Sequence, residues 1–270
     1  MIAISDNVQL RKDVPSGTIT LNRPDCRNAL SREMIAMIQQ ALDDFAHEGS
    51  VRAVILTGSG DTFCSGTDLF QLKETAESPD AFKIWHEDAK AFQDLIETML
   101  RYPKPIVAAV NGWNVGSGLA LMLASDIVIA GESSRLLMPE PLRGLNAGMT
   151  TPLLTFRAGV AAASKILFSG QPVLAEEAAR LGLFHETVSD DLIWARAHEL
   201  ATQCAAGARE SHQMTRQMLN ETIGESLFTQ LSIGAANMAA ARTTPAALEG
   251  IKAFLEKRDP DWNQLGENLE

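Results

Sequence analysis

Two glycine-rich turns and one glutamate are the residues of this chain whose types and spacing could do chemistry. Residues 65–68 follow an apolar run at 53–56, residues 116–118 follow another at 106–110, and Glu140 stands further along. A turn that leads from a strand into a helix leaves backbone N–H groups unpaired, and glycine lets a ligand come close to them. Such N–H groups can bind a phosphate, or a carbonyl oxygen that becomes an oxyanion.

The turn at residues 116–118 admits three interpretations when it is taken alone. A dinucleotide-binding fingerprint would need a third glycine where Leu121 stands, which disfavours that interpretation. The glycines could also serve only to pack a strand tightly against a helix. The second, similar turn upstream favours a pair of oxyanion donors.

Four sequence blocks, in order along the chain, resemble the crotonase (enoyl-CoA hydratase/isomerase) superfamily. They are Asn22-Arg23-Pro24 with Asn28-Ala29-Leu30, residues 56–69, residues 104–112, and Pro139-Glu140 followed by Gly144; residues 254–258 form a weaker fifth block. The resemblance implies an α/β fold, a spiral of ββα units with a helical C-terminal trimerisation part. We therefore expect a core at residues 1–205, which holds CoA and the active site, and a helical part at 206–270 that forms trimers or dimers of trimers.

The resemblance also assigns roles at the site. The backbone N–H groups of Thr67 and Ser117 would hold the thioester carbonyl oxygen, and Glu140 would be the catalytic acid/base. Burial of Glu140 in an apolar cleft would raise its pKa, which suits proton transfer near neutral pH. The alternative for Glu140 is a solvated loop carboxylate.

One position departs from the pattern of the hydratases in this family. Hydratases hold a water molecule between two glutamates, and Ala120 stands where the first of them would be. A single glutamate can move a proton from C2 to C4, so we expect an enoyl-CoA isomerase. The alternatives are an enoyl-CoA hydratase (a lyase) that acts on a non-standard acyl group, and a CoA-ester-binding protein without catalysis.

The resemblance further implies which residues contact the substrate. Residues expected to bind CoA are Cys26, Arg27, Ser65, Asp68, Leu69, Phe254 and Lys257. Residues expected to line the acyl pocket are Trp113, Met138, Leu142, Arg143 and Met149. Arg143 suggests a polar or carboxylated acyl group, and no cofactor is expected beyond the coenzyme A of the substrate itself.

Composition restricts the function classes. The chain has 270 residues and a net charge of −11, which argues against a nucleic-acid partner because phosphate binding relies on clustered basic residues. Three cysteines without paired spacing indicate neither a disulfide framework nor a metal site and suit a reducing compartment. With no apolar run long enough to span a membrane and no leader-like N-terminus, the chain is expected to be cytoplasmic.

Hydrophobic periodicity predicts strands and helices in alternation, followed by helices alone. The expected strands are 17–22, 53–57, 106–110 and 126–130. The expected helices are one that Ser31 caps and Gly49 stops, then 82–100, one after Gly116, 175–181, 190–206, 213–222, 227–241 and 244–258. Residues 69–80 are expected to form a loop or a loosely held helix.

Overall fold

A computed structural model describes residues 3–262 and contains two β-sheets that the chain visits in turn. The larger sheet has the strand order β1-β2-β3-β4-β6-β8-β11. Its strands are β1 (Ala3–Ser5), β2 (Val8–Asp13), β3 (Ser16–Leu21), β4 (Ala53–Gly58), β6 (Ile106–Val110), β8 (Ile127–Gly131) and β11 (Glu186–Val188). From β3 to β11 the neighbouring strands are parallel, and such sheets need helical crossovers between strands.

The smaller sheet has the order β10-β9-β7-β5. Its strands are β5 (Thr62–Cys64), β7 (Trp113–Val115), β9 (Arg135–Leu137) and β10 (Val173–Leu174). The chain passes three times from the larger sheet to the smaller one and then into a helix, by way of β4 and β5, β6 and β7, and β8 and β9. This repetition is the predicted spiral of ββα units.

Ten α-helices lie around and between the sheets in the described part of the chain. They are α1 (Arg32–His47), α2 (Leu69–Ala76), α3 (Ala81–Leu100), α4 (Ser117–Leu123), α5 (Thr150–Ser169), α6 (Ala175–Arg180), α7 (Ile193–Ala205), α8 (Arg209–Gln217), α9 (Glu225–Ala241) and α10 (Pro245–Leu255). Helix α1 begins as predicted, because the hydroxyl of Ser31 accepts a hydrogen bond from the N–H of Met34 and so caps its first turn. None of the described helices is both long and apolar enough to cross a membrane.

Hydrophobic packing lies on both faces of the larger sheet. One face carries the main core with helices α1, α3, α4 and α5, where Phe45, Phe63 and Met34 are fully buried. The other face is covered by α7, whose Ile193, Ala197 and Ala201 contact the strands. Burial on both faces explains why β6 is an uninterrupted apolar run.

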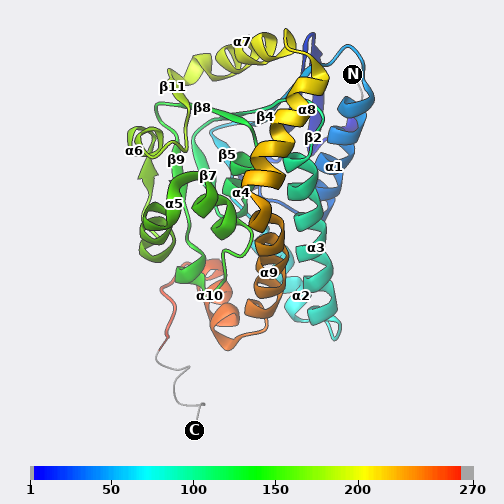
Figure 1. Cartoon of the computed structure of the whole chain (residues 1–270). Helices are drawn as coiled ribbons and strands as arrows, with labels where there is room; N and C mark the ends of the chain where they lie inside the picture. Colours follow the sequence, from blue (N-terminus) through cyan, green and yellow to red (C-terminus); the bar gives the residue numbers. More distant parts are fainter. Residues whose placement is uncertain (1–2, 263–270) are drawn as a thin grey trace.

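The C-terminal helices return to the part of the spiral that carries the glycine-rich turns. Helix α9 packs along α3, and α10 packs against α2 and the short helix η2 (Glu140–Arg143). In Figure 1, α8 and α9 run down beside α3, and α10 closes the lower end of the molecule. Helix α7 ends at Ala205, and α9, which follows it in the chain, contributes residues to the cavities described below.

Several segments differ from the sequence-based expectation. Strand β2 and the short strands were not predicted, and the helix expected at residues 213–222 is α8 followed by a π-helix (Met218–Ile223). Residues 69–76 form the regular helix α2 because Asp68 accepts hydrogen bonds from the N–H groups of Phe70 and Gln71. Helix α5 was not predicted, and the positive φ of Gly159, +78°, interrupts it. Its apolar residues do not follow one stripe, because its first half packs between α4 and α9.

Candidate active site

The first glycine-rich turn presents a backbone donor toward the interior. The N–H of Leu30 donates to the Gly66 carbonyl (2.8 Å), and the N–H of Asp68 donates to the Leu30 carbonyl (3.0 Å). Since the hydrogen bonds on both sides of Thr67 go to Leu30, the N–H of Thr67 itself faces the opposite way. It therefore points away from Leu30 and stays available to a ligand.

The second turn brings another donor to the same place. Gly116 has φ +56° and ψ −121°, a conformation that only glycine adopts readily. It delivers the chain into α4 so that Ser117 is the first helical residue, whose N–H has no partner within the helix. The hydroxyls of Thr67 and Ser117 are 2.8 Å apart, so the two turns meet at these residues.

Glu140 lies against this meeting point. It opens the short helix η2, whose end is fixed by Gly144 in a left-handed conformation and by the N–H of Leu145, which donates to the Glu140 carbonyl (2.9 Å). A Cβ atom placed on Gly116 would be 2.5 Å from Oε1 of Glu140. The carboxylate therefore occupies the space that the absent side chain of Gly116 leaves free.

The carboxyl group of Glu140 is poised to exchange protons near neutral pH. Its Oε2 is buried and has no hydrogen-bond partner among the described residues. Burial raises the pKa of Glu140 from 4.5 to about 7, against the opposing effect of the Arg143 guanidinium. A pKa near the operating pH is what a general acid/base requires.

A small cavity of about 30 Å³ lies between the two turns and Glu140. That is enough space to hold a water molecule. Glu140 is the one carboxylate among its described lining residues. Ala120, one turn into α4, is fully buried in the core and supplies no polar group.

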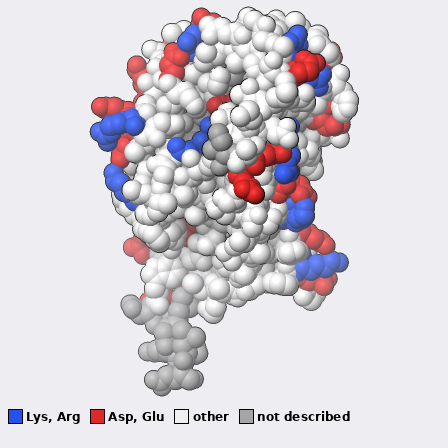
Figure 2. All heavy atoms as spheres, in the orientation of Figure 1, with Lys and Arg blue, Asp and Glu red and all other residues white. Residues whose placement is uncertain are grey.

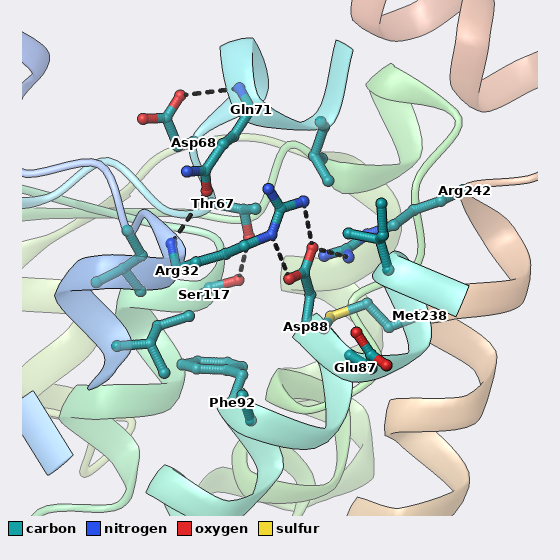
Figure 3. A pocket seen from close by; sticks show the side chains of 15 residues that line it. Arg32, Thr67, Asp68, Gln71, Glu87, Asp88, Phe92, Ser117, Met238 and Arg242 are labelled. Atoms are coloured by element: carbon teal, nitrogen blue, oxygen red, sulfur yellow. Dashed lines mark hydrogen bonds and ion pairs between the residues drawn. The ribbon is translucent and has the colours of Figure 1, made fainter. Parts of the chain in front are cut away.

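A larger cavity of about 350 Å³ shares Thr67, Leu72, Ser117, Met238 and Arg242 with the small one. It opens between α1, α2, α3 and α9, and Figure 3 shows Arg32, Asp88 and Arg242 gathered on one side of it, with Phe92 and Met238 nearby. Sequence reasoning missed these five residues. Asp88 and Phe92 belong to a helix that was predicted, but which of its residues face a cavity depends on the packing of α9.

The five residues expected in the acyl pocket are not brought together. Trp113 is half-buried beside Arg135, while Met138 and Met149 lie in the main core. Leu142 is 51% exposed. Arg143 alone of these five lines a described cavity, the small one, where its guanidinium lies 4.1 Å above the ring of Phe254.

The residues expected to bind CoA lie mostly around the first turn. Ser65 donates from its hydroxyl to the Cys26 carbonyl (3.2 Å) and from its N–H to the Arg27 carbonyl (3.0 Å), while Cys26 and Arg27 are exposed. Asp68 caps α2 and pairs with Arg23 at 3.1 Å. The remaining three are Leu69, which lines the small cavity, and Phe254 and Lys257, which lie exposed at the end of α10.

Comparison with known proteins places this site in a family. The sequence model of the enoyl-CoA hydratase/isomerase family matches residues 16–265. The chain belongs to this family. The mixed α/β spiral with its helical C-terminal part is therefore the crotonase fold.

Relatives and solved structures of this family resemble the chain over nearly its whole length. A Thermus thermophilus protein named "Putative enoyl-CoA hydratase" is 37% identical over 90% of this chain and 95% of its own. The 1,2-epoxyphenylacetyl-CoA isomerase of Escherichia coli is 32% identical over 91% and 94%. The crystal structure of an enoyl-CoA hydratase/isomerase from Xanthobacter autotrophicus Py2 superposes with a TM-score of 0.85, at 27% identity and 93% coverage of both chains. Because these names include hydratase and isomerase, family membership leaves the reaction open.

Proposed function

We propose that the protein is an enoyl-CoA isomerase in which Glu140 moves one proton along the acyl chain. The observation that carries the proposal is the single carboxylate in the cavity between the two turns. The N–H groups of Thr67 and Ser117 bind the thioester carbonyl oxygen. No cofactor is needed beyond the coenzyme A of the substrate.

The reaction follows from the charge that develops on the thioester. Ionised Glu140 takes a proton from C2 of a 3-enoyl-CoA, and the electron pair moves into a dienolate whose negative oxygen accepts hydrogen bonds from Thr67 and Ser117. The proton on Glu140 exchanges with solvent while the dienolate is bound, and Glu140 then donates a proton to C4, which leaves the double bond between C2 and C3. Each oxyanion donor is worth roughly 3–4 kcal/mol in comparable enzymes, and the pKa of Glu140 near 7 lets it act as base and then as acid.

Hydration of a 2-enoyl-CoA is the second candidate. It is favoured by the name of the Thermus thermophilus relative and by a small cavity large enough for one water molecule. Against it stands Ala120, which cannot help Glu140 to hold or activate that water. A protein that binds CoA esters without catalysis is the third candidate.

The deciding experiment uses 3-hexenoyl-CoA and 2-hexenoyl-CoA in D2O, with the products followed by mass spectrometry. Migration of the double bond, with deuterium at C2 and C4 and no 3-hydroxyacyl product, is expected. Both should be lost in Glu140→Gln. Rapid formation of 3-hydroxyhexanoyl-CoA would refute the isomerase proposal in favour of the hydratase, and binding without exchange would favour the non-catalytic candidate.

The proposal extends to substrate contacts and assembly. We assign CoA binding to the residues around the first turn, which the hydrogen bonds of Ser65 hold together, and to the end of α10. We also propose a cytoplasmic location and assembly into a homotrimer or dimer of trimers. The proposed assembly rests on the apolar side chains that α5 and the C-terminal helices expose. They are Phe156, Val160, Phe168, Met214, Met218, Leu219 and Ile233.

Light scattering coupled to gel filtration measures the mass and tests the assembly. On the face of the molecule that Figure 2 draws, broad uncharged areas lie between small groups of acidic and basic side chains. A monomer at micromolar concentration would contradict the proposed assembly without affecting the proposed chemistry.

A further inference from the structure

Arg242 is a buried cation that lacks a full partner. It follows the last residue of α9, is 4% exposed, and lines both the larger cavity and the small cavity beside it. Its Nη1 is buried without a hydrogen-bond acceptor among the described residues, and its nearest carboxylate is Asp88, with Nη1 and Oδ2 4.0 Å apart. Burial lowers the pKa of Arg242 to about 10, against the opposing effect of Asp88, so the side chain stays charged at neutral pH.

Asp88 does not neutralise the charge of Arg242, because its carboxylate already forms an ion pair with Arg32. Nε of Arg32 donates to Oδ1 of Asp88 (2.5 Å) and Nη2 donates to Oδ2 (2.9 Å). This two-pronged pairing uses both carboxylate oxygens. Two guanidinium groups therefore share one carboxylate, and the cluster keeps one positive charge in excess (Figure 3).

The other acidic residues on the cavity wall are engaged elsewhere. Asp68 pairs with Arg23 and caps α2. Glu87 is exposed and lies 3.9 Å from Lys83. Neither makes a hydrogen bond or an ion pair with Arg242 in the described part of the chain. Glu140 lines the small cavity together with Arg242, but its Oε2 has no hydrogen-bond partner and the two residues form no ion pair in the described structure. The excess charge is therefore not balanced by a direct partner.

The cavity joins this excess charge to the oxyanion donors. Thr67 and Ser117 form part of its wall, and Leu30, Phe92 and Met238 give it apolar sides. A volume of about 350 Å³ falls in the range of small-molecule sites, which combine apolar walls with a few polar groups that fix the ligand. A thioester held at the two turns would direct its acyl chain into this space.

We propose that the larger cavity binds an acyl chain whose far end carries a carboxylate, and that this carboxylate pairs with Arg242. The inference rests on the proposed function, which puts the thioester carbonyl at Thr67 and Ser117. An isolated buried charge costs several kcal/mol unless it is paired. A substrate carboxylate supplies the missing partner, in the planar geometry that a guanidinium recognises.

The test compares ligands that differ only at the far end of the acyl chain. Adipyl-CoA and hexanoyl-CoA are saturated, so neither reacts, and they end in a carboxylate and a methyl group respectively. Isothermal titration calorimetry of the full chain should give at least about tenfold tighter binding of adipyl-CoA, a difference of about 1.4 kcal/mol. Equal affinities, or a preference for hexanoyl-CoA, would overturn the inference.

Substitutions assign the preference to Arg242. Arg242→Met keeps an unbranched side chain without the charge, and it should abolish the preference for adipyl-CoA over hexanoyl-CoA. The matched control is Arg180→Met, an exposed arginine of α6 away from the cavity, which should keep the preference. If Arg242→Met does not fold, Arg242→Lys retains the charge and should keep part of the preference.

The same titrations separate this inference from the proposed function. If both acyl-CoA esters bind with equal affinity, the proposed acyl-CoA site is supported and the proposed role of Arg242 is refuted. If neither ester binds, both proposals fall. A wild-type preference that survives in Arg242→Met would also refute the assignment to this residue.

Discussion

The raised pKa of Glu140 predicts that the protein loses stability as the pH rises. The carboxyl has a pKa of about 7 in the folded protein, against an ordinary value of 4.5. Between these values the folded state keeps a proton that the unfolded chain has released, so stability falls with rising pH and levels off above about pH 7. The difference corresponds to at most about 3 kcal/mol.

Glu140→Gln removes the ionisable group, so it should also remove the loss of folding stability at rising pH. The variant should gain stability over the wild type by up to about 3 kcal/mol between about pH 4 and pH 8. Urea unfolding followed by circular dichroism measures it, provided that the denaturant slopes of the two proteins agree. The control Glu132→Gln changes an exposed turn residue, and its stability should stay within about 0.5 kcal/mol of the wild type.

Activity should depend on the ionisation of the same carboxyl, but it should rise with pH where the stability falls. Only ionised Glu140 can take the C2 proton, so kcat/KM for 3-hexenoyl-CoA should rise with pH and level off above about pH 7. Glu140→Gln should lower it by roughly 10²–10⁴-fold. If the difference in stability between the wild type and Glu140→Gln were constant from about pH 4 to pH 8, the raised pKa of the buried carboxyl would be refuted. If the variant reacted as fast as the wild type, the role of Glu140 as the base would be refuted.

Three further substitutions test the local structure. Gly116→Ala should abolish isomerisation and destabilise the fold, because its Cβ would meet the Glu140 carboxylate and its φ is positive; enzyme assays and thermal unfolding measure both. Arg216→Met should cost about 3 kcal/mol in urea unfolding, since the buried guanidinium pairs with Asp126 and binds two backbone carbonyls. Ser31→Ala should cost about 1 kcal/mol in the same assay through loss of the α1 cap.

Each of these substitutions has a control in the chain. Gly182→Ala has a positive φ but open space around its Cβ, so it should lower stability without affecting activity. Arg180→Met and Ser133→Ala change exposed residues and should stay within about 0.5 kcal/mol of the wild type. A Gly116→Ala variant that keeps its activity would contradict the role given to Gly116. If Arg180→Met or Ser133→Ala lost as much stability as Arg216→Met or Ser31→Ala, the structural role given to the buried residue would be contradicted.

Local sequence was sufficient where a few neighbouring residues determine the conformation. The predicted strand at residues 106–110 has the bounds of β6, because a short run of apolar β-formers between breaks suits one buried conformation. Ser31 placed the start of α1 correctly, since a cap acts within one turn. Short strands such as β5 and β7 escaped detection, because three residues carry too little periodicity and depend on pairing with distant strands.

Tertiary structure decided the parts of the site that come from distant segments. The two turns and Glu140 could be named from local motifs and a family resemblance, yet their approach at Gly116 is a property of the folded chain. Residues expected around the acyl chain, such as Met138 and Met149, are buried in the core instead of lining a described cavity. Neighbours in sequence point in different directions, so motif proximity does not predict which side chains face a cavity.

The sequence alone therefore determined the family, the alternation of strands and helices, and the residues of the glycine-rich turns, because each is encoded within one continuous stretch. The charge balance of the larger cavity could only come from the three-dimensional structure. Arg32, Asp88 and Arg242 belong to three segments that meet when α9 packs along α3. Whether a buried charge is paired depends on distances of a few ångströms between such segments, and sequence order does not contain those distances.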